Sequence, residues 1–164
     1  MGMGIGFIFA GCGGTFWTAT PMLAALVRKY RPRLCAFVDP DAVEKKNLTR
    51  QWVNSPAGMY KADIARNAVM GPLAKEAIAH VGYMPGRDAL DGVVEGQFAD
   101  MDVIVICNVD NNEGRLAMRN WCRRRKGFAG MILSGCDKDH GQVYSGKWID
   151  GEPIRDWLED HPDV

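Results

Sequence analysis

Residues 38–51 read V-D-P-D-A-V-E-K-K-N-L-T-R-Q. They begin at the end of a short apolar run, residues 34–38, which predicts a buried β-strand. The acids, the Asn, the Arg and the Gln that follow form a dense polar cluster at the carboxyl end of this strand. Ligands of open α/β sheets bind at that end of the strands. The stretch therefore predicts an α/β fold with a ligand site beside residues 39–51.

The first 30 residues predict a strand, a glycine turn and a helix. Residues 4–10 are apolar without polar alternation, which is typical of a buried strand, and G-C-G-G follows at 11–14. From Thr15 onwards, apolar residues recur at helical spacing; Pro21 leaves open whether the regular helix begins there or earlier with an irregular turn. Small residues before a helix N-terminus let backbone N–H groups approach an anion, so this unit predicts phosphate binding.

The polar cluster separates two kinds of nucleotide enzyme. Asp39 ends the second strand, where a carboxylate can accept both hydroxyls of a ribose, and up to this point a dinucleotide-binding dehydrogenase fits equally well. Asn47, Arg50 and Gln51 favour a triphosphate, because a permanently charged guanidinium suits phosphate oxygens. Lys61 opens the next predicted helix, where a lysine opposes the helix dipole by about 0.3–1 kcal/mol, a cost that an anion ligand can offset.

A second acid is predicted at the same edge of the sheet. Residues 102–107 (D-V-I-V-I-C) form the clearest strand, fit for the centre of a parallel sheet. Asp110 follows its carboxyl end, near Asp39, and a carboxylate beside phosphates is a natural Mg²⁺ ligand. The alternative is a helix N-cap, a role for which Asn111 and Asn112 also qualify.

The remaining segments complete an α/β prediction: a Rossmann-like, mostly parallel central sheet with helices on both faces and an antiparallel extension at the C-terminal end. Residues 73–84 are open between a helix and a third strand over 77–83. The other expected elements are a helix over 61–70, a short helix with Leu90, Val93, Val94 and Phe98, a helix over 113–125, a strand over 131–134, an antiparallel segment over 141–145 and a closing helix with Ile154, Trp157 and Leu158.

Composition indicates an ordinary globular protein. The chain has 164 residues, a length that predicts one domain over 1–164, with 47% hydrophobic residues and 20 basic against 20 acidic residues. Zero net charge gives no indication of nucleic-acid or membrane-surface binding, and no apolar run is long enough to span a bilayer. The five cysteines are odd in number and widely spaced, which favours buried thiols in a reducing cytoplasm. C-x-x-C is absent and residues 136–140 match no standard zinc spacing, so no zinc site is expected.

In this order, the motifs resemble the adenylation domain of the ubiquitin-activating enzyme superfamily, of the ThiF/MoeB/HesA type. The resemblance runs from about residue 4 to 145, and its most specific part is the D-x-D-x-V-x-x-x-N-L-x-R-Q element with a G-x-x-K lysine at the matching distance. It rests on G-C-G-G (11–14), D-P-D-A-V-E-K-K-N-L-T-R-Q (39–51), G-M-Y-K (58–61), V-D-N-N-E-G-R (109–115) and G-Q-V (141–143).

The resemblance implies an adenylyltransferase that uses ATP and Mg²⁺ to activate the C-terminal glycine carboxylate of a small ubiquitin-like or sulfur-carrier protein, with release of pyrophosphate. It also implies a homodimer or a heterodimer with a related subunit. The implied ATP-binding roles are the nucleotide turn for Gly11, Gly13 and Gly14, ribose binding for Asp39, phosphate binding for Asn47, Arg50, Gln51 and Lys61, and a less defined ATP-binding role for Asp41. Asp110 is the implied Mg²⁺ ligand, and the implied catalytic residues are Arg50, Lys61 and Asp110. Cys136 follows a predicted strand and is a candidate thiolate nucleophile, with an incidental thiol as the alternative.

The sequence departs from the family pattern at several points. Thr15 and Phe16 stand where the family turn has a third glycine, the N-terminal helices of many members are missing, and zinc-binding cysteine pairs are absent. These departures keep open a second hypothesis, a catalytically degenerate subunit that pairs with an active partner. A nicotinamide-dependent oxidoreductase is the third.

Overall fold

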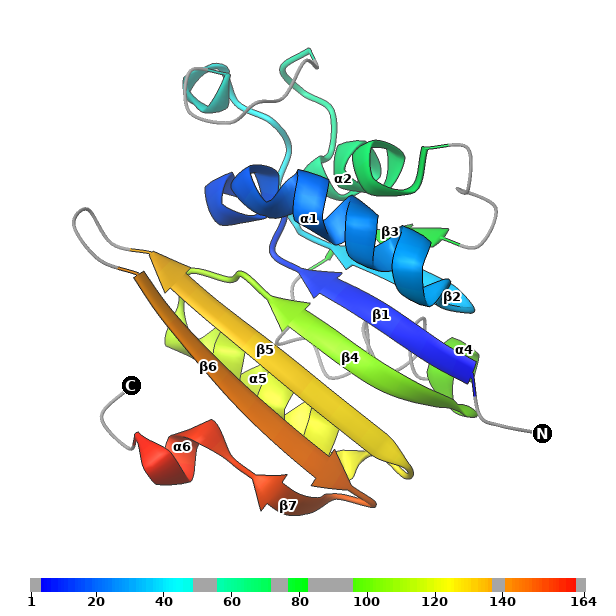
Figure 1. Ribbon diagram of the computed structural model, residues 1–164. Coiled ribbons are helices and arrows are strands. Elements are labelled where there is room, and N and C mark those ends of the chain that lie inside the picture. Colours follow the sequence, from blue (N-terminus) through cyan, green and yellow to red (C-terminus); the bar gives the residue numbers. More distant parts are fainter. Residues whose placement is uncertain (1–3, 49–55, 72–76, 83–95, 137–140, 162–164) are drawn as a thin grey trace.

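The computed structural model describes residues 4–48, 56–71, 77–82, 96–136 and 141–161. They form one seven-stranded sheet with helices on its two faces (Figure 1). The strands are β1 (Gly4–Ala10), β2 (Leu34–Val38), β3 (Ala77–His80), β4 (Met101–Cys107), β5 (Phe128–Cys136), β6 (Gly141–Ile149) and β7 (Glu152–Arg155). The helices are α1 (Gly14–Tyr30), the 3₁₀ helix η1 (Lys45–Asn47), α2 (Lys61–Met70), α4 (Gly96–Phe98), α5 (Asn112–Arg124) and α6 (Trp157–Asp160).

The strand order is β3-β2-β1-β4-β5-β6-β7, and the first five strands are parallel. β6 and β7 are antiparallel additions at one edge. The chain moves outward from β1 to β3, returns to β4 on the other side of β1 and continues outward. This places a topological switch point between β1 and β4, the position where doubly wound sheets bind ligands. The predicted fold class is confirmed, including the antiparallel extension.

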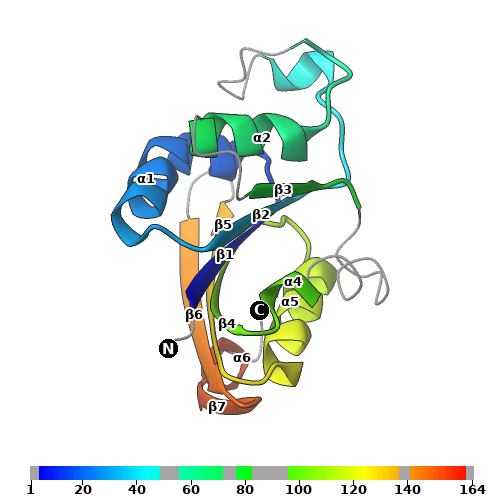
Figure 2. The ribbon, with the colours of Figure 1, turned by 90° about the vertical axis from the view of Figure 1, so that its right-hand side faces the viewer.

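Alternating side chains of the buried strands supply two cores, one on each face of the sheet. The helices α1 and α2 lie over one face and α5 lies over the other (Figure 2). In β1, Phe7 and Phe9 pack under α1 and α2, whereas Ile8 and Ala10 join the core with α5. The apolar strand therefore needs no polar face, which is why its sequence does not alternate. None of the helices in the described ranges is long and apolar enough to cross a membrane.

Three sequence expectations are resolved by the fold. Residues 77–80 form strand β3, in parallel register with β2, so the helix alternative for this segment is wrong. α1 runs unbroken from Gly14 with Pro21 inside it, so the regular helix begins before the proline. Ile154 was expected in a closing helix but lies in β7; only Trp157 and Leu158 enter α6. Of the short helix expected before β4, only Phe98 falls within the described residues, in α4.

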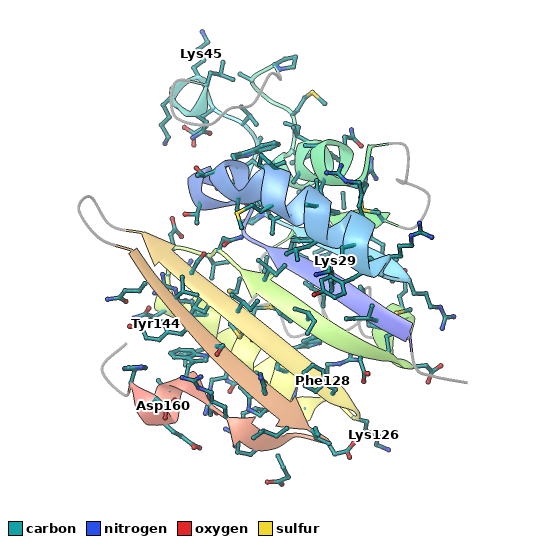
Figure 3. The ribbon with its side chains drawn as sticks, viewed as in Figure 1. Lys29, Lys45, Lys126, Phe128, Tyr144 and Asp160 are labelled. Atoms are coloured by element: carbon teal, nitrogen blue, oxygen red, sulfur yellow. The ribbon has the colours of Figure 1, made fainter. Side chains whose placement is uncertain are left out.

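The C-terminal elements are fastened by aromatic packing and one buried ion pair. Tyr144 of β6 lies with its ring centroid 6.2 Å from that of Trp157 and 4.9 Å from that of His161 (Figure 3). Arg119 of α5 donates to both carboxylate oxygens of Asp156, at 2.7 and 2.5 Å, and both residues are buried. α6 is thus anchored to α5 by a bidentate pair, the stronger geometry for arginine and carboxylate.

Candidate active site

A cavity of about 420 Å³ opens at the switch point between β1 and β4. The two strands are tied there by the hydrogen bond from Asn108 N to Ala10 O, at 2.7 Å, after which the chain turns into α1 on one side and α5 on the other. The divergence of the two turns leaves the crevice open. Its lining comes from the glycine turn, the end of β2, the start of α2 and the β4–α5 turn: Gly11, Gly13, Gly14, Thr15, Val38, Asp39, Pro40, Asp41, Lys61, Asn108, Val109, Asp110, Asn111, Glu113 and Gly114.

The glycine turn contains glycines of two different kinds. Gly11 has a φ of +81°, and a Cβ there would lie 2.8 Å from the carbonyl carbon of Asn108 and 2.8 Å from the nitrogen of Val109. Gly13 and Gly14 have open space where a Cβ would be. α1 begins at Gly14 without a side-chain cap and without an acid in its first turn. Its first N–H groups therefore face the cavity with only the partial positive charge of the helix end, the arrangement that binds phosphate.

Phe16 explains how the turn works without the third glycine of the family pattern. Its side chain is fully buried, with its ring edge-on to Phe9 and Phe37 at centroid distances of 6.2 and 6.3 Å. A large aromatic side chain thus fills the space between the helix and the sheet.

Asp39 joins the second strand to the glycine turn. Its Oδ2 accepts a hydrogen bond from Cys12 N at 2.7 Å and its Oδ1 accepts one from Asp41 N at 2.8 Å. Burial raises the pKa of Asp39, although these two bonds and the charge of Lys61 favour the ionised carboxylate. Burial and the charge of Asp39 together raise the pKa of the Cys12 thiol well above its usual value, which disfavours its thiolate form.

Lys61 is not the surface residue that its position at a helix start would suggest. Its side chain is only 9% exposed, and Nζ forms a 2.8 Å ion pair with Oδ2 of Asp41. Asn47 takes a different place: it is buried and its Oδ1 accepts from Glu44 N at 2.8 Å, which closes η1, and it does not line the cavity. Arg50 and Gln51 lie outside the described residues.

The sequence left open whether Asp110 is a ligand of Mg²⁺ or the N-cap of the next helix. The side chain of Asn111 caps α5 by accepting from Gly114 N at 2.7 Å. Asp110 is exposed and its carboxylate is left to the cavity, where Asn111 Nδ2 approaches it at 3.4 Å. The cap is therefore the asparagine, and the acid remains available to a ligand.

Two further polar residues at this edge were missed by the sequence reasoning. Asn108 follows β4 directly and accepts from Ser134 Oγ at 2.5 Å, while its buried Nδ2 finds no hydrogen-bond partner among the described residues. Glu113, in the first turn of α5, lines the cavity beside Asp110. Their places directly after a strand and in the first turn of the next helix are signals that the sequence does carry. Cys136 is the last residue of β5, in register with Gly141 of β6, and its candidate role stays a prediction.

Among the described residues, four carboxylates and the ammonium of Lys61 line the cavity; the carboxylates are those of Asp39, Asp41, Asp110 and Glu113. Within the described ranges, no three His, Cys, Asp or Glu side chains converge as a closed metal cage. Open carboxylate oxygens such as that of Asp110 fit Mg²⁺, because this ion takes one or two carboxylates and completes its octahedron with phosphates and water.

Comparison with known proteins identifies the fold. No protein-family model and no curated protein sequence matches the chain. Among solved structures, Escherichia coli MccB with AMPCPP and MccA matches with a TM-score of 0.62 and 18% identity, over 89% of this chain and 41% of MccB. MccB alone matches with a TM-score of 0.61 and 18% identity over 96% and 45% of the two chains, and MccB with ATP with 0.54 and 18% over 77% and 36%. The chain thus spans less than half the length of MccB. The chain has the fold of the part of MccB that it matches.

Proposed function

We propose that the chain is an adenylyltransferase that uses ATP to activate the C-terminal carboxylate of a small protein or peptide. The observation that carries the proposal is the buried ammonium of Lys61 in the same cavity as the glycine turn, Asp39 and Asp110. The dinucleotide of a dehydrogenase needs no lysine at this place, whereas the additional phosphate oxygens of a triphosphate need a cation there. The shared fold with MccB, which has been solved with ATP, supports the same reading.

In the proposed reaction an acceptor carboxylate displaces pyrophosphate at the α-phosphorus of ATP. The acceptor is already an anion, so no general base is needed. The chain's contribution is position and charge: N–H groups at the start of α1 hold a phosphate, Asp39 accepts the ribose hydroxyls on lone pairs that its two backbone bonds leave unused, and Lys61 neutralises phosphate oxygens. Arg50 and Gln51 remain predicted phosphate ligands.

Asp110 is the proposed Mg²⁺ ligand, and Glu113 of the first turn of α5 is a second carboxylate in the cavity. When bound, the metal supplies charge neutralisation on the phosphates. Among the described residues that line the cavity, carboxylates outnumber the ammonium of Lys61, so we expect the magnesium complex of the triphosphate to bind in preference to the free triphosphate.

The acceptor class is proposed from two sources. The resemblance to the ThiF/MoeB/HesA family favours a small ubiquitin-like or sulfur-carrier protein with a C-terminal glycine, and MccB was solved with the MccA peptide. Pairing with a second copy or a related subunit stays a prediction.

The test combines nucleotide binding with isotope exchange. Titration calorimetry with AMPCPP and Mg²⁺ measures binding without turnover. Exchange of labelled pyrophosphate into ATP is then measured with a synthetic peptide that ends in Gly-Gly as a free acid, and with the same peptide as an amide. Exchange is expected with the acid only, since the amide offers no attacking carboxylate.

Two substitutions assign the roles. Lys61→Ala and Asp110→Ala are each expected to lower the exchange rate by about two to three orders of magnitude. Lys45→Ala is the matched control, because Lys45 projects from η1 into solvent away from the sheet (Figure 3). A normal exchange rate in the Lys61 and Asp110 variants would contradict the roles proposed for these two residues. Binding of AMPCPP without exchange with any carboxylate would favour the degenerate subunit, and binding of NADH instead of AMPCPP would favour the oxidoreductase.

A further inference from the structure

Asp41 occupies a position between the ribose acid and the phosphate lysine that suits neither role. Its backbone is fixed at both ends: Asp41 N donates to Asp39 Oδ1 at 2.8 Å, and Asp41 O accepts from Lys61 N at 2.9 Å. The neighbouring Ala42 pairs with Tyr60 as an isolated antiparallel bridge. The carboxylate of Asp41 is therefore held at a defined place beside the start of α2.

That carboxylate is directed at Lys61 and is half open to the cavity. The Asp41 side chain is 56% exposed, while the Lys61 side chain with which it pairs at 2.8 Å is 9% exposed. A continuous run of hydrogen bonds thus leads from Cys12 N in the glycine turn through Asp39 and Asp41 to Lys61 Nζ. The turn that receives phosphate and the lysine that neutralises it are placed by the same two acids.

From this geometry we infer that Asp41 is a positioning residue that holds Lys61 for the nucleotide and does not bind the nucleotide itself. The inference rests on the proposed function for its nucleotide half. An ammonium has three N–H donors, and the bond to Asp41 leaves two for phosphate oxygens. A carboxylate that lines a triphosphate cavity also repels the phosphates, so Asp41 opposes binding while it orients the lysine.

These two effects of Asp41 have opposite signs, which makes them separable. Removal of the charge in Asp41→Asn is expected to tighten AMPCPP binding about fivefold, the size of one like-charge contact at about 4 Å in water. The same change releases Lys61 from its fixed position, and the maximal exchange rate is expected to fall about ten- to a hundredfold, as displacement of a catalytic group by about 1 Å does. A merely structural residue would weaken binding and rate together.

Asp63→Asn is the matched control. Asp63 lies in α2, two residues after Lys61, and its replacement by asparagine removes the same charge as Asp41→Asn. Its ion pair is with Arg66 at 3.6 Å, and it does not line the cavity. It is expected to leave binding and rate unchanged. Thermal unfolding followed by circular dichroism checks that Asp41→Asn and Asp63→Asn fold. Asp41→Glu is a second variant at the same position, which keeps the charge but moves it by one methylene. It is expected to bind AMPCPP almost normally and to have a reduced maximal exchange rate.

A measurement without nucleotide tests the holding of Lys61 by itself. Acetylation by N-hydroxysuccinimidyl acetate, quantified by mass spectrometry and normalised to exposed Lys45, is expected to be about fivefold faster at Lys61 in Asp41→Asn than in the wild type, because the ion pair with Asp41 no longer holds Nζ. Unchanged acetylation, or weaker AMPCPP binding in Asp41→Asn, overturns the inference. Faster acetylation in a protein that does not bind AMPCPP overturns the proposed function and the nucleotide half of the inference, while the holding of Lys61 by Asp41 stands.

Discussion

Replacement of Gly11 by alanine is the sharpest test of how the glycine turn is built. The residue has a φ of +81°, where a side chain is strained by roughly 1–2 kcal/mol. The added Cβ would also stand 2.8 Å from two backbone atoms of the β4–α5 turn, the carbonyl carbon of Asn108 and the nitrogen of Val109. These main-chain atoms cannot rotate away as a side chain can, so the whole turn would have to shift. Overpacking of this kind costs about 1–3 kcal/mol. Together the two effects predict a loss of about 2–5 kcal/mol in the free energy of unfolding for Gly11→Ala.

Gly14→Ala is the control from the same motif. It is the first residue of α1, has no atom within 4 Å of its Cβ position and no positive φ. Alanine is the better helix former, so this variant is expected to be between neutral and about 1 kcal/mol more stable than the wild type. Urea denaturation followed by circular dichroism at 222 nm measures both variants. A Gly11→Ala protein within about 0.5 kcal/mol of the wild type, or an equal loss in both variants, would refute the reasoning.

Three other outcomes follow from the packing. Asp156→Asn leaves the buried Arg119 unpaired and is expected to cost about 3–5 kcal/mol in urea denaturation at neutral pH. Burial tends to raise the pKa of Asp156, but the hydrogen bond from Arg119 outweighs it and holds the pKa below the ordinary 3.8. The stabilisation by this pair is therefore present above that value and lost as the pH falls through the lower folded pKa. A difference in unfolding free energy between the wild type and Asp156→Asn that stays constant down to about pH 2 would contradict this. Asn111→Ala removes the cap of α5 and should lower the unfolding free energy by about 1 kcal/mol in the same assay, and no change would argue against the cap. Burial raises the pKa of Cys107 to about 11 and that of Cys122 to about 12, so DTNB at about pH 8 should label either thiol only as the protein unfolds, and rapid labelling of the native protein would count against this packing.

The central strands were predictable because they are buried on both faces. A strand between two layers of helices must be apolar throughout, and the apolar runs at 34–38 and 102–107 coincide with β2 and β4 to within one residue. β7 was missed for the opposite reason. Its four residues are all exposed, and the strand exists because β6 offers hydrogen-bonding partners, which are not encoded in the local pattern.

The site was predictable where residues directly follow strands. Asp39 and Asp110 follow β2 and β4, and parallel strands bring their carboxyl ends to one edge, so the cavity contains both. Asn47 shows the limit of this reasoning. It belongs to the same sequence motif as Asp39, but three residues of η1 turn its side chain back onto Glu44 N and away from the cavity.

The sequence alone determined the order of the strands and helices apart from β3, which it left open, and β7, which it missed. It also determined the strand-turn-helix unit that suits phosphate and the set of residue types that favours a triphosphate over a dinucleotide. These depend on local pattern and spacing. The tertiary structure decided which glycine of the turn is indispensable, that Lys61 is buried, and that Asp41 holds it. Each of these depends on atoms from segments that are distant in the chain: Gly11 meets Asn108, and Asp41 meets Lys61 across 20 positions. The residue types of the stretch at 38–51 therefore favour a nucleotide ligand, and packing against α2 and the β4–α5 turn decides where each of these residues lies.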